Sequence, residues 1–128
     1  RLLPLHQEVY GQLSRRMLAI WLPLTKVDYE HGSIRVVPTS HLKGLLPHGF
    51  INNTGFAAHG ALDQSTELSE IVLNLDPGDG VLFDGLLLHG SWPSTKKLLR
   101  TVIVCRYNDV NHAPWLKDHD NDIRIAQL

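Results

Sequence analysis

Cysteine is almost absent from this sequence, and two other features that would indicate a partner or an address are missing. The single Cys105 cannot form a disulfide within the chain, which favours a reducing compartment, and we expect the cytoplasm. No apolar run approaches the roughly 20 residues of a membrane-spanning helix, so no membrane partner is expected. Lys and Arg total 12 against 13 Asp and Glu, a net charge of −1 without a basic stripe, which argues against a nucleic-acid partner.

The sequence also lacks internal repeats, linkers and a convincing helical pattern, so we expect one mainly β domain over residues 1–128. The chain opens at Arg1 without a methionine and is apolar from Leu2 onward, which predicts a domain that is incomplete at its N-terminus. Short apolar runs between Gly and Pro turn signals predict strands. These strands cover residues 17–27, 33–37, 71–75, 80–83, 86–89 and 98–107.

A set of short strands without helices predicts an all-β sandwich or barrel of the jelly-roll kind. Within the apolar run over residues 17–27, Pro23 indicates that the strand bends or lies at an edge beyond that point. Residues 43–70 are weakly patterned and rich in Gly, Asn and His, so we interpret them as a long insertion or an active-site loop.

Three residues have the chemistry of metal ligands. If His6 and Glu8 lie on a strand, its period of two turns both side chains to the same face. A second histidine from a distant strand would complete the two-histidine, one-carboxylate set of non-haem Fe(II) oxygenases, and His89, at the end of the predicted strand 86–89, is the candidate. An H-x-E tripeptide alone also arises by chance in proteins without a metal.

Two further residues could bind an anion near these ligands. Arg100 opens an apolar strand, where a buried guanidinium needs an anionic partner, and a bidentate pair with a carboxylate would hold the far end of a dicarboxylate. Ser91 follows His89 by two residues, so it shares a strand face with His89 and its hydroxyl could bind the same carboxylate.

In order and spacing, these residues and several motifs between them resemble the landmarks of the phytanoyl-CoA dioxygenase family, over about residues 5–107. The motifs that carry the resemblance are His6-Gln7-Glu8, Trp21-Leu22-Pro23-Leu24, Gly32 to His41 (GSIRVVPTSH), Gly78 to Phe83 (GDGVLF), His89-Gly90-Ser91 and Arg100.

The resemblance implies a double-stranded β-helix (cupin-like jelly-roll) core and a dioxygenase that uses Fe(II), 2-oxoglutarate and dioxygen to hydroxylate a small molecule, with release of succinate and CO₂. It implies that His6, Glu8 and His89 are both the metal ligands and the catalytic residues. It further implies that Arg100 binds the distal carboxylate of 2-oxoglutarate, and that Ser91 and Trp21 line the cosubstrate pocket, although Trp21 could equally fill the core.

Two positions depart from the family pattern. Glu8 stands where the family usually has aspartate, so the metal must lie farther from the strand or the side chain must fold back. Thr39 stands where the family usually has glycine, so a turn that needs a positive φ is in question there.

The remaining candidates are mostly interpreted as structural. His48 and His59 could face substrate, since loops at a barrel mouth commonly carry specificity, whereas Asp84 could bond a ligand histidine or serve a turn. The other histidines are expected in turns or in solvent: His31, His41, His112 and His119.

Two other functions use the same residues. One is a cupin-like metalloenzyme with a His/Glu/His site, such as a zinc hydrolase or an isomerase. The other is a β-barrel binding module without activity that retains the motifs.

Overall fold

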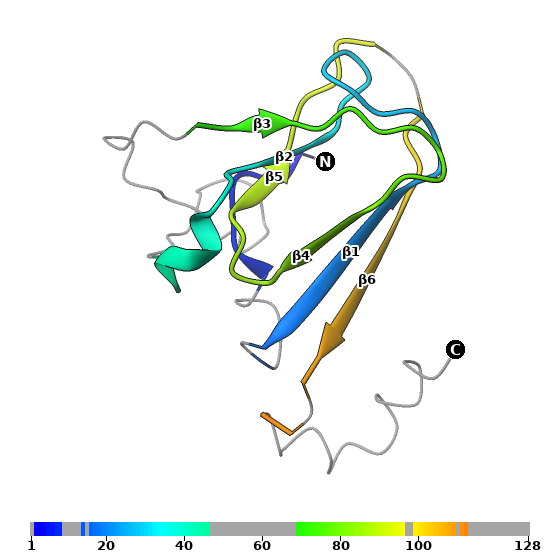
Figure 1. The fold of residues 1–128 in the computed structure, drawn as a ribbon. Helices are drawn as coiled ribbons and strands as arrows, with labels where there is room; N and C mark the ends of the chain where they lie inside the picture. Colours follow the sequence, from blue (N-terminus) through cyan, green and yellow to red (C-terminus); the bar gives the residue numbers. More distant parts are fainter. Residues whose placement is uncertain are drawn as a thin grey trace.

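The computed structural model of the chain describes residues 2–8, 14, 16–46, 69–96, 99–109 and 111–112. Its strands form two antiparallel sheets, which Figure 1 shows as two groups of arrows. The first sheet has the order β4-β1-β6 and contains β1 (Met17–Pro23), β4 (Val81–Asp84) and β6 (Val102–Asn108). The second has the order β3-β2-β5 and contains β2 (Ile34–Val36), β3 (Ile71–Val72) and β5 (His89–Ser91).

The core lies between the two sheets because each contributes one apolar face. Along β1, burial alternates so that Met17, Ala19 and Trp21 point inward, as the period of a strand requires. Ile34 and Val36 of β2 meet them from the other sheet. Two packed antiparallel sheets of short strands confirm the predicted all-β jelly-roll core.

All six predicted strands have different bounds in the structure, and two of these differences bear on the site. The first ends at Pro23, the residue at which its sequence predicted a bend or an edge. The strand predicted over residues 86–89 was expected to end at His89, but β5 begins at that residue. The prediction of a strand over residues 86–89 is therefore wrong. The Asp84 side chain accepts a hydrogen bond from Leu86 N at 2.7 Å and its carbonyl accepts one from Leu87 N at 2.8 Å. These bonds close a turn before β5.

The turn at Thr39 keeps the conformation that glycine would favour. Thr39 has φ of 62°, an unusual value for a β-branched residue, and precedes the 3-10 helix η2 (Ser40–Lys43). The hydroxyl of the buried Ser40 accepts a hydrogen bond from Leu88 N at 2.8 Å. The turn therefore fixes the backbone directly before His89.

Residues 47–68, most of the predicted insertion, lie outside the described residues, and so do His48 and His59. In the part of the chain that is described, no helix has the length and apolar character needed to cross a membrane.

Replacement of Ile34 by alanine tests the position of the core. Ile34 is 3% exposed whereas Ile71, in the neighbouring strand β3, is 49% exposed. We expect Ile34→Ala to lower the free energy of unfolding by about 2–5 kcal/mol, because it removes buried methyl groups and leaves a cavity. Ile71→Ala should change it by about 0.5 kcal/mol or less. Denaturant unfolding measures both, and equal losses would contradict this assignment of the core.

Candidate metal centre

A reciprocal pair of backbone hydrogen bonds brings the two candidate histidines together. His6 N donates to His89 O at 2.8 Å, and His89 N donates to His6 O at 3.1 Å, which forms an isolated antiparallel bridge. The ring centroids of His6 and His89 lie 4.4 Å apart. The expectation that His6 and Glu8 lie on one strand is not met, because in the described part of the chain the backbone bonds of this segment to β5 come from Leu3 and His6 and do not extend to Glu8.

Backbone carbonyls fix the orientation of both imidazoles. His6 Nδ1 lies 2.8 Å from Pro4 O, and His89 Nδ1 lies 2.9 Å from Leu87 O. A carbonyl oxygen can only accept, so we assign the proton to Nδ1 in each ring. The Nε2 atoms are then left with lone pairs. This is the arrangement by which an outer hydrogen bond prepares a histidine for metal coordination.

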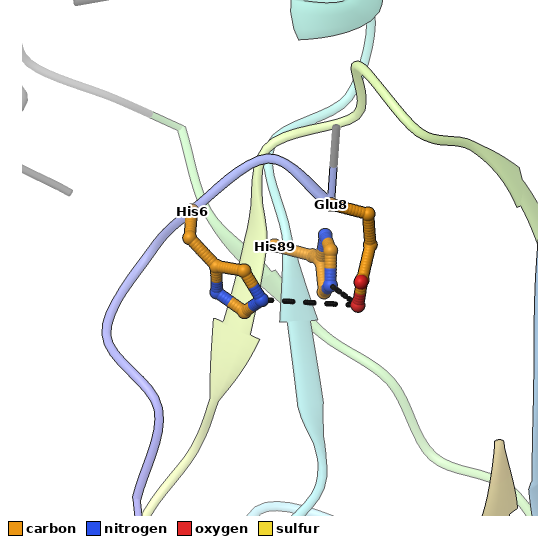
Figure 2. A group of neighbouring side chains, drawn as sticks. All are labelled: His6, Glu8 and His89. Atoms are coloured by element: carbon orange, nitrogen blue, oxygen red, sulfur yellow. Dashed lines mark hydrogen bonds and ion pairs between the residues drawn. The ribbon is translucent and has the colours of Figure 1, made fainter. Parts of the chain in front are cut away.

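Glu8 completes the group, as Figure 2 shows. Its Oε1 lies 3.3 Å from His89 Nε2 and 3.8 Å from His6 Nε2. The ligand atoms of the three residues all lie within 4.8 Å of one another. Glu8 and His89 are buried and His6 is partly buried, so these atoms have little water to solvate them.

The carboxyl group of Glu8 is anionic at any pH near neutrality. Burial alone would raise the pKa of Glu8, but its contacts with His6 and His89, and the hydrogen bonds and positive charge of Arg106, hold it well below the usual range. Arg106 donates from Nε to Oε2 at 2.7 Å and from Nη2 to Oε1 at 3.0 Å. This bidentate pair compensates the buried charge.

The donor set fits a divalent metal ion. With protons on both Nδ1 atoms, neutral rings direct the lone pairs of two Nε2 atoms toward the same carboxylate oxygen, Oε1 of Glu8. Lone pairs that face one another at 3.3–3.8 Å are stable only with a cation among them, either a proton on an imidazole or a metal ion. Two imidazoles and one carboxylate suit divalent zinc or a first-row transition metal such as iron.

A cavity of about 70 Å³ adjoins these ligands and is lined by the other predicted site residues: Trp21, Ser91 and Arg100. Ser91 Oγ accepts a hydrogen bond from Leu3 N at 3.1 Å. Ser33 also lines the cavity, and its hydroxyl is itself buried and has no hydrogen-bond partner within the described ranges. A guanidinium and the Ser91 hydroxyl beside one small cavity can bind an anion.

Sequence reasoning missed two polar residues of the site. Arg106 lies six residues after Arg100, so the periodicity of the predicted strand 98–107 could have placed both on one face, although β6 itself begins at Val102. Gln7, at 1% exposure, donates to Gly44 O and Leu86 O and accepts from Leu46 N. No pattern in the sequence identifies those partners, because they come from distant segments.

Other candidates have structural roles or lie outside the described residues. His31 Nδ1 lies 2.7 Å from the Asp28 carboxylate, and His41 lies in η2. Asp84 serves the turn before β5 rather than a ligand histidine, because its carboxylate bonds Leu86 N. His119 lies outside the described residues.

Gly90 allows the segment that carries His6 to approach β5. His6 bonds His89, and Leu3 bonds Ser91. Between these two contacts the segment has one residue more than β5, as in a β-bulge. The extra residue is accommodated opposite Gly90, where a Cβ atom would lie 2.8 Å from Pro4 O and 3.0 Å from Leu5 N. The Pro4 carbonyl, which orients His6, can therefore occupy its place only if Gly90 has no side chain.

Comparisons with known proteins identify the family of the chain. The family model "Phytanoyl-CoA dioxygenase (PhyH)" matches residues 3–102. A protein of Caenorhabditis elegans named "Probable phytanoyl-CoA dioxygenase" is 32% identical over 110 residues, which cover 81% of this chain and 35% of that protein. The peroxisomal phytanoyl-CoA dioxygenase of Bos taurus is 29% identical over 84% of this chain and 34% of its own length. The chain thus spans about a third of these relatives.

Solved structures share the fold. EvdO2 of Micromonospora carbonacea var. aurantiaca, solved in complex with 2-oxoglutarate, superposes with a TM-score of 0.66 at 27% identity, over 90% of this chain and 51% of that chain. The epimerase SnoN, solved with Fe³⁺, alpha-ketoglutarate and nogalamycin RO, superposes with a TM-score of 0.63 at 17% identity, over 84% of this chain and 42% of that chain.

Replacement of Gly90 by alanine tests the close approach at the bulge. The new methyl group would meet backbone atoms of Pro4 and Leu5, and backbone cannot rotate away as a side chain can. We expect Gly90→Ala to lower the free energy of unfolding by about 1–3 kcal/mol and to alter the His6 signals in long-range ¹H–¹⁵N spectra. Gly80→Ala is the control, because its Cβ would meet only the flexible end of Leu22. Unchanged His6 signals in Gly90→Ala would contradict this role.

Proposed function

The chain belongs to the phytanoyl-CoA dioxygenase family, and from this premise we propose that it forms the metal-binding core of an Fe(II)- and 2-oxoglutarate-dependent oxygenase. The observation that carries the proposal is the convergence of three ligand atoms, His6 Nε2, His89 Nε2 and Glu8 Oε1. Both imidazoles are already oriented for coordination by their Nδ1 contacts. Nitrogen and carboxylate ligands of this kind, with open positions, are typical of non-haem Fe(II) oxygenases.

The cavity beside the ligands supports a dicarboxylate cosubstrate. Arg100 lines it and forms no hydrogen bond or ion pair within the ranges that the structure describes, so its guanidinium is available to a ligand. Arginine binds carboxylates through two parallel hydrogen bonds. We assign the distal carboxylate of 2-oxoglutarate to Arg100, assisted by the Ser91 hydroxyl, while Trp21 forms part of the cavity wall. The similar EvdO2 was solved in complex with 2-oxoglutarate, which supports the choice of this cosubstrate.

When bound, iron and 2-oxoglutarate supply the oxidising chemistry: with dioxygen they convert a C–H bond of a small molecule to C–OH and release succinate and CO₂. The protein's own residues bind and orient. His6, Glu8 and His89 hold the metal, Arg100 fixes the cosubstrate, and Phe83 packs against the His89 ring with centroids 4.6 Å apart. This aromatic contact helps to exclude water from one side of the site.

A zinc hydrolase would use the same three ligand types. It would leave Arg100 and Ser91 without a ligand in the cavity, which is why we prefer the oxygenase. Measuring which metal the purified protein retains, and whether 2-oxoglutarate binds to that complex, distinguishes the two functions.

Removal of one imidazole tests the metal site. We expect His89→Ala to abolish tight Fe(II) binding, because two ligands remain where three are needed. His41→Ala, which removes a histidine from η2 outside the ligand group, should retain the parent affinity. Anaerobic Fe(II) titration by calorimetry measures both. If His89→Ala binds iron as tightly as the parent, His89 is not a ligand.

Removal of the guanidinium of Arg100 tests the cosubstrate site. Arg100→Ala should weaken 2-oxoglutarate binding by about 2–5 kcal/mol, the range for truncation of one partner of a buried charge pair. Iron binding should stay close to that of the parent, because Arg100 is not a member of the ligand group. Titration of the anaerobic iron complex with 2-oxoglutarate is the measurement. Equal affinities in variant and parent would place the carboxylate clamp elsewhere.

The product formed in chloride-rich buffer tests the role of Glu8. Halogenation requires a vacant metal position that a halide can occupy, and the Glu8 carboxylate directs an oxygen to that position. We therefore expect an oxygenated product, identified by mass spectrometry, once a substrate is found by screening for succinate release. A chlorinated product from the parent protein would mean that Glu8 does not bind the metal.

A further inference from the structure

Arg106 is the one arginine that contacts the candidate metal ligands within the described part of the chain. It lies on β6 opposite Ala19 of β1, so its side chain points to the same interior face as the buried Ala19 methyl group. Its Nε donates to Glu8 Oε2 at 2.7 Å and its Nη2 donates to Oε1 at 3.0 Å. The Glu8 side chain is 9% exposed and that of Arg106 is 37% exposed, so the contact closes one side of the site.

The two oxygens of Glu8 have different surroundings. Oε1 lies nearest to the imidazoles, at 3.3 Å from His89 Nε2 and 3.8 Å from His6 Nε2. Oε2 receives the shortest hydrogen bond of the carboxylate, from Arg106. Each carboxylate oxygen has two lone pairs, so Oε1 can accept from Arg106 Nη2 and still bind an ion. The fork of Arg106 thus bonds both oxygens, more closely at Oε2, and fixes the carboxylate so that Oε1 is the oxygen next to the imidazoles.

This division matters because glutamate is longer than the aspartate that is usual at this position. The additional methylene adds a rotatable bond, which would let both oxygens turn toward a metal held by His6 and His89. Carboxylates bind metals in one-oxygen and two-oxygen modes. A second bond from Glu8 would consume a position that a chelating cosubstrate needs.

We propose that Arg106 is the positioning residue of Glu8: its guanidinium holds Oε2, so that Glu8 offers Oε1 alone to a metal ion bound by His6 and His89. The proposal rests on the proposed function, since it concerns the same metal site. In this chain, Arg106 offsets the longer carboxylate and keeps coordination positions open for 2-oxoglutarate. Arg100, which precedes β6, and Arg106, within β6, line the same cavity and then have separate tasks, one toward the cosubstrate and one toward the metal ligand.

The test is Co(II) binding to the full protein, followed by visible absorption, because the ligand-field bands of Co(II) report its coordination. Arg106→Lys keeps the positive charge but loses the planar fork. We expect this variant to show a changed Co(II) spectrum before any cosubstrate is added. Its Co(II) complex should bind 2-oxoglutarate about tenfold or more weakly than that of the parent, the usual scale for loss of a residue that supports a metal ligand.

Arg100→Lys is the matched control, since it makes the same substitution at the other arginine that lines the same cavity. It should weaken 2-oxoglutarate binding and leave the spectrum of the Co(II) protein unchanged. A parent-like spectrum and parent-like 2-oxoglutarate affinity in Arg106→Lys would overturn the proposal while leaving the oxygenase function intact. Arg106→Met removes the charge as well as the fork, and a spectrum equal to that of the parent would overturn it too. Failure of the parent to bind Co(II) would overturn both the function and this inference.

Discussion

The site depends on the antiparallel pairing of His6 with His89. These residues are far apart in the sequence, and two backbone hydrogen bonds of 2.8 Å and 3.1 Å hold their Cα atoms opposite one another. The pairing also presents a backbone carbonyl to the Nδ1 atom of each ring. Position and tautomer are therefore both set by main-chain atoms, which vary less with sequence than side-chain partners do.

Several elements support this one pair. The Thr39 turn and Ser40 fix Leu88 N, Gln7 ties the segment between the two ligands His6 and Glu8 to Gly44 O and Leu86 O, and Gly90 admits the backbone of Pro4. None of these groups has to touch a metal or a cosubstrate. Each limits how far the ligand atoms can move, and this is how a rigid scaffold prepares a site before its ligand arrives.

The charge of Glu8 is the second constraint on the site. A carboxylate buried beside two imidazoles and an aromatic ring is costly unless it is paired. The structure supplies two kinds of partner: a permanent cation, Arg106, and two imidazoles that favour a cation between themselves and Oε1. The charge of Arg106 balances that of Glu8, so a divalent ion would be bound through the donor atoms Nε2 and Oε1 rather than attracted by a net negative charge.

The sequence by itself determined the all-β class, because its short alternating runs can be buried only as strands of packed sheets. Its resemblance to the family in motif order and spacing predicted the site residues His6, Glu8, His89, Arg100, Ser91 and Trp21. Only the tertiary structure decided that β5 starts at His89, since a turn closed by Asp84 replaces the expected strand. Only the tertiary structure paired Arg106 with Glu8, and bonded Gln7 to distant carbonyls. Those contacts join segments 37–98 residues apart, and local sequence patterns contain no information about which distant groups meet.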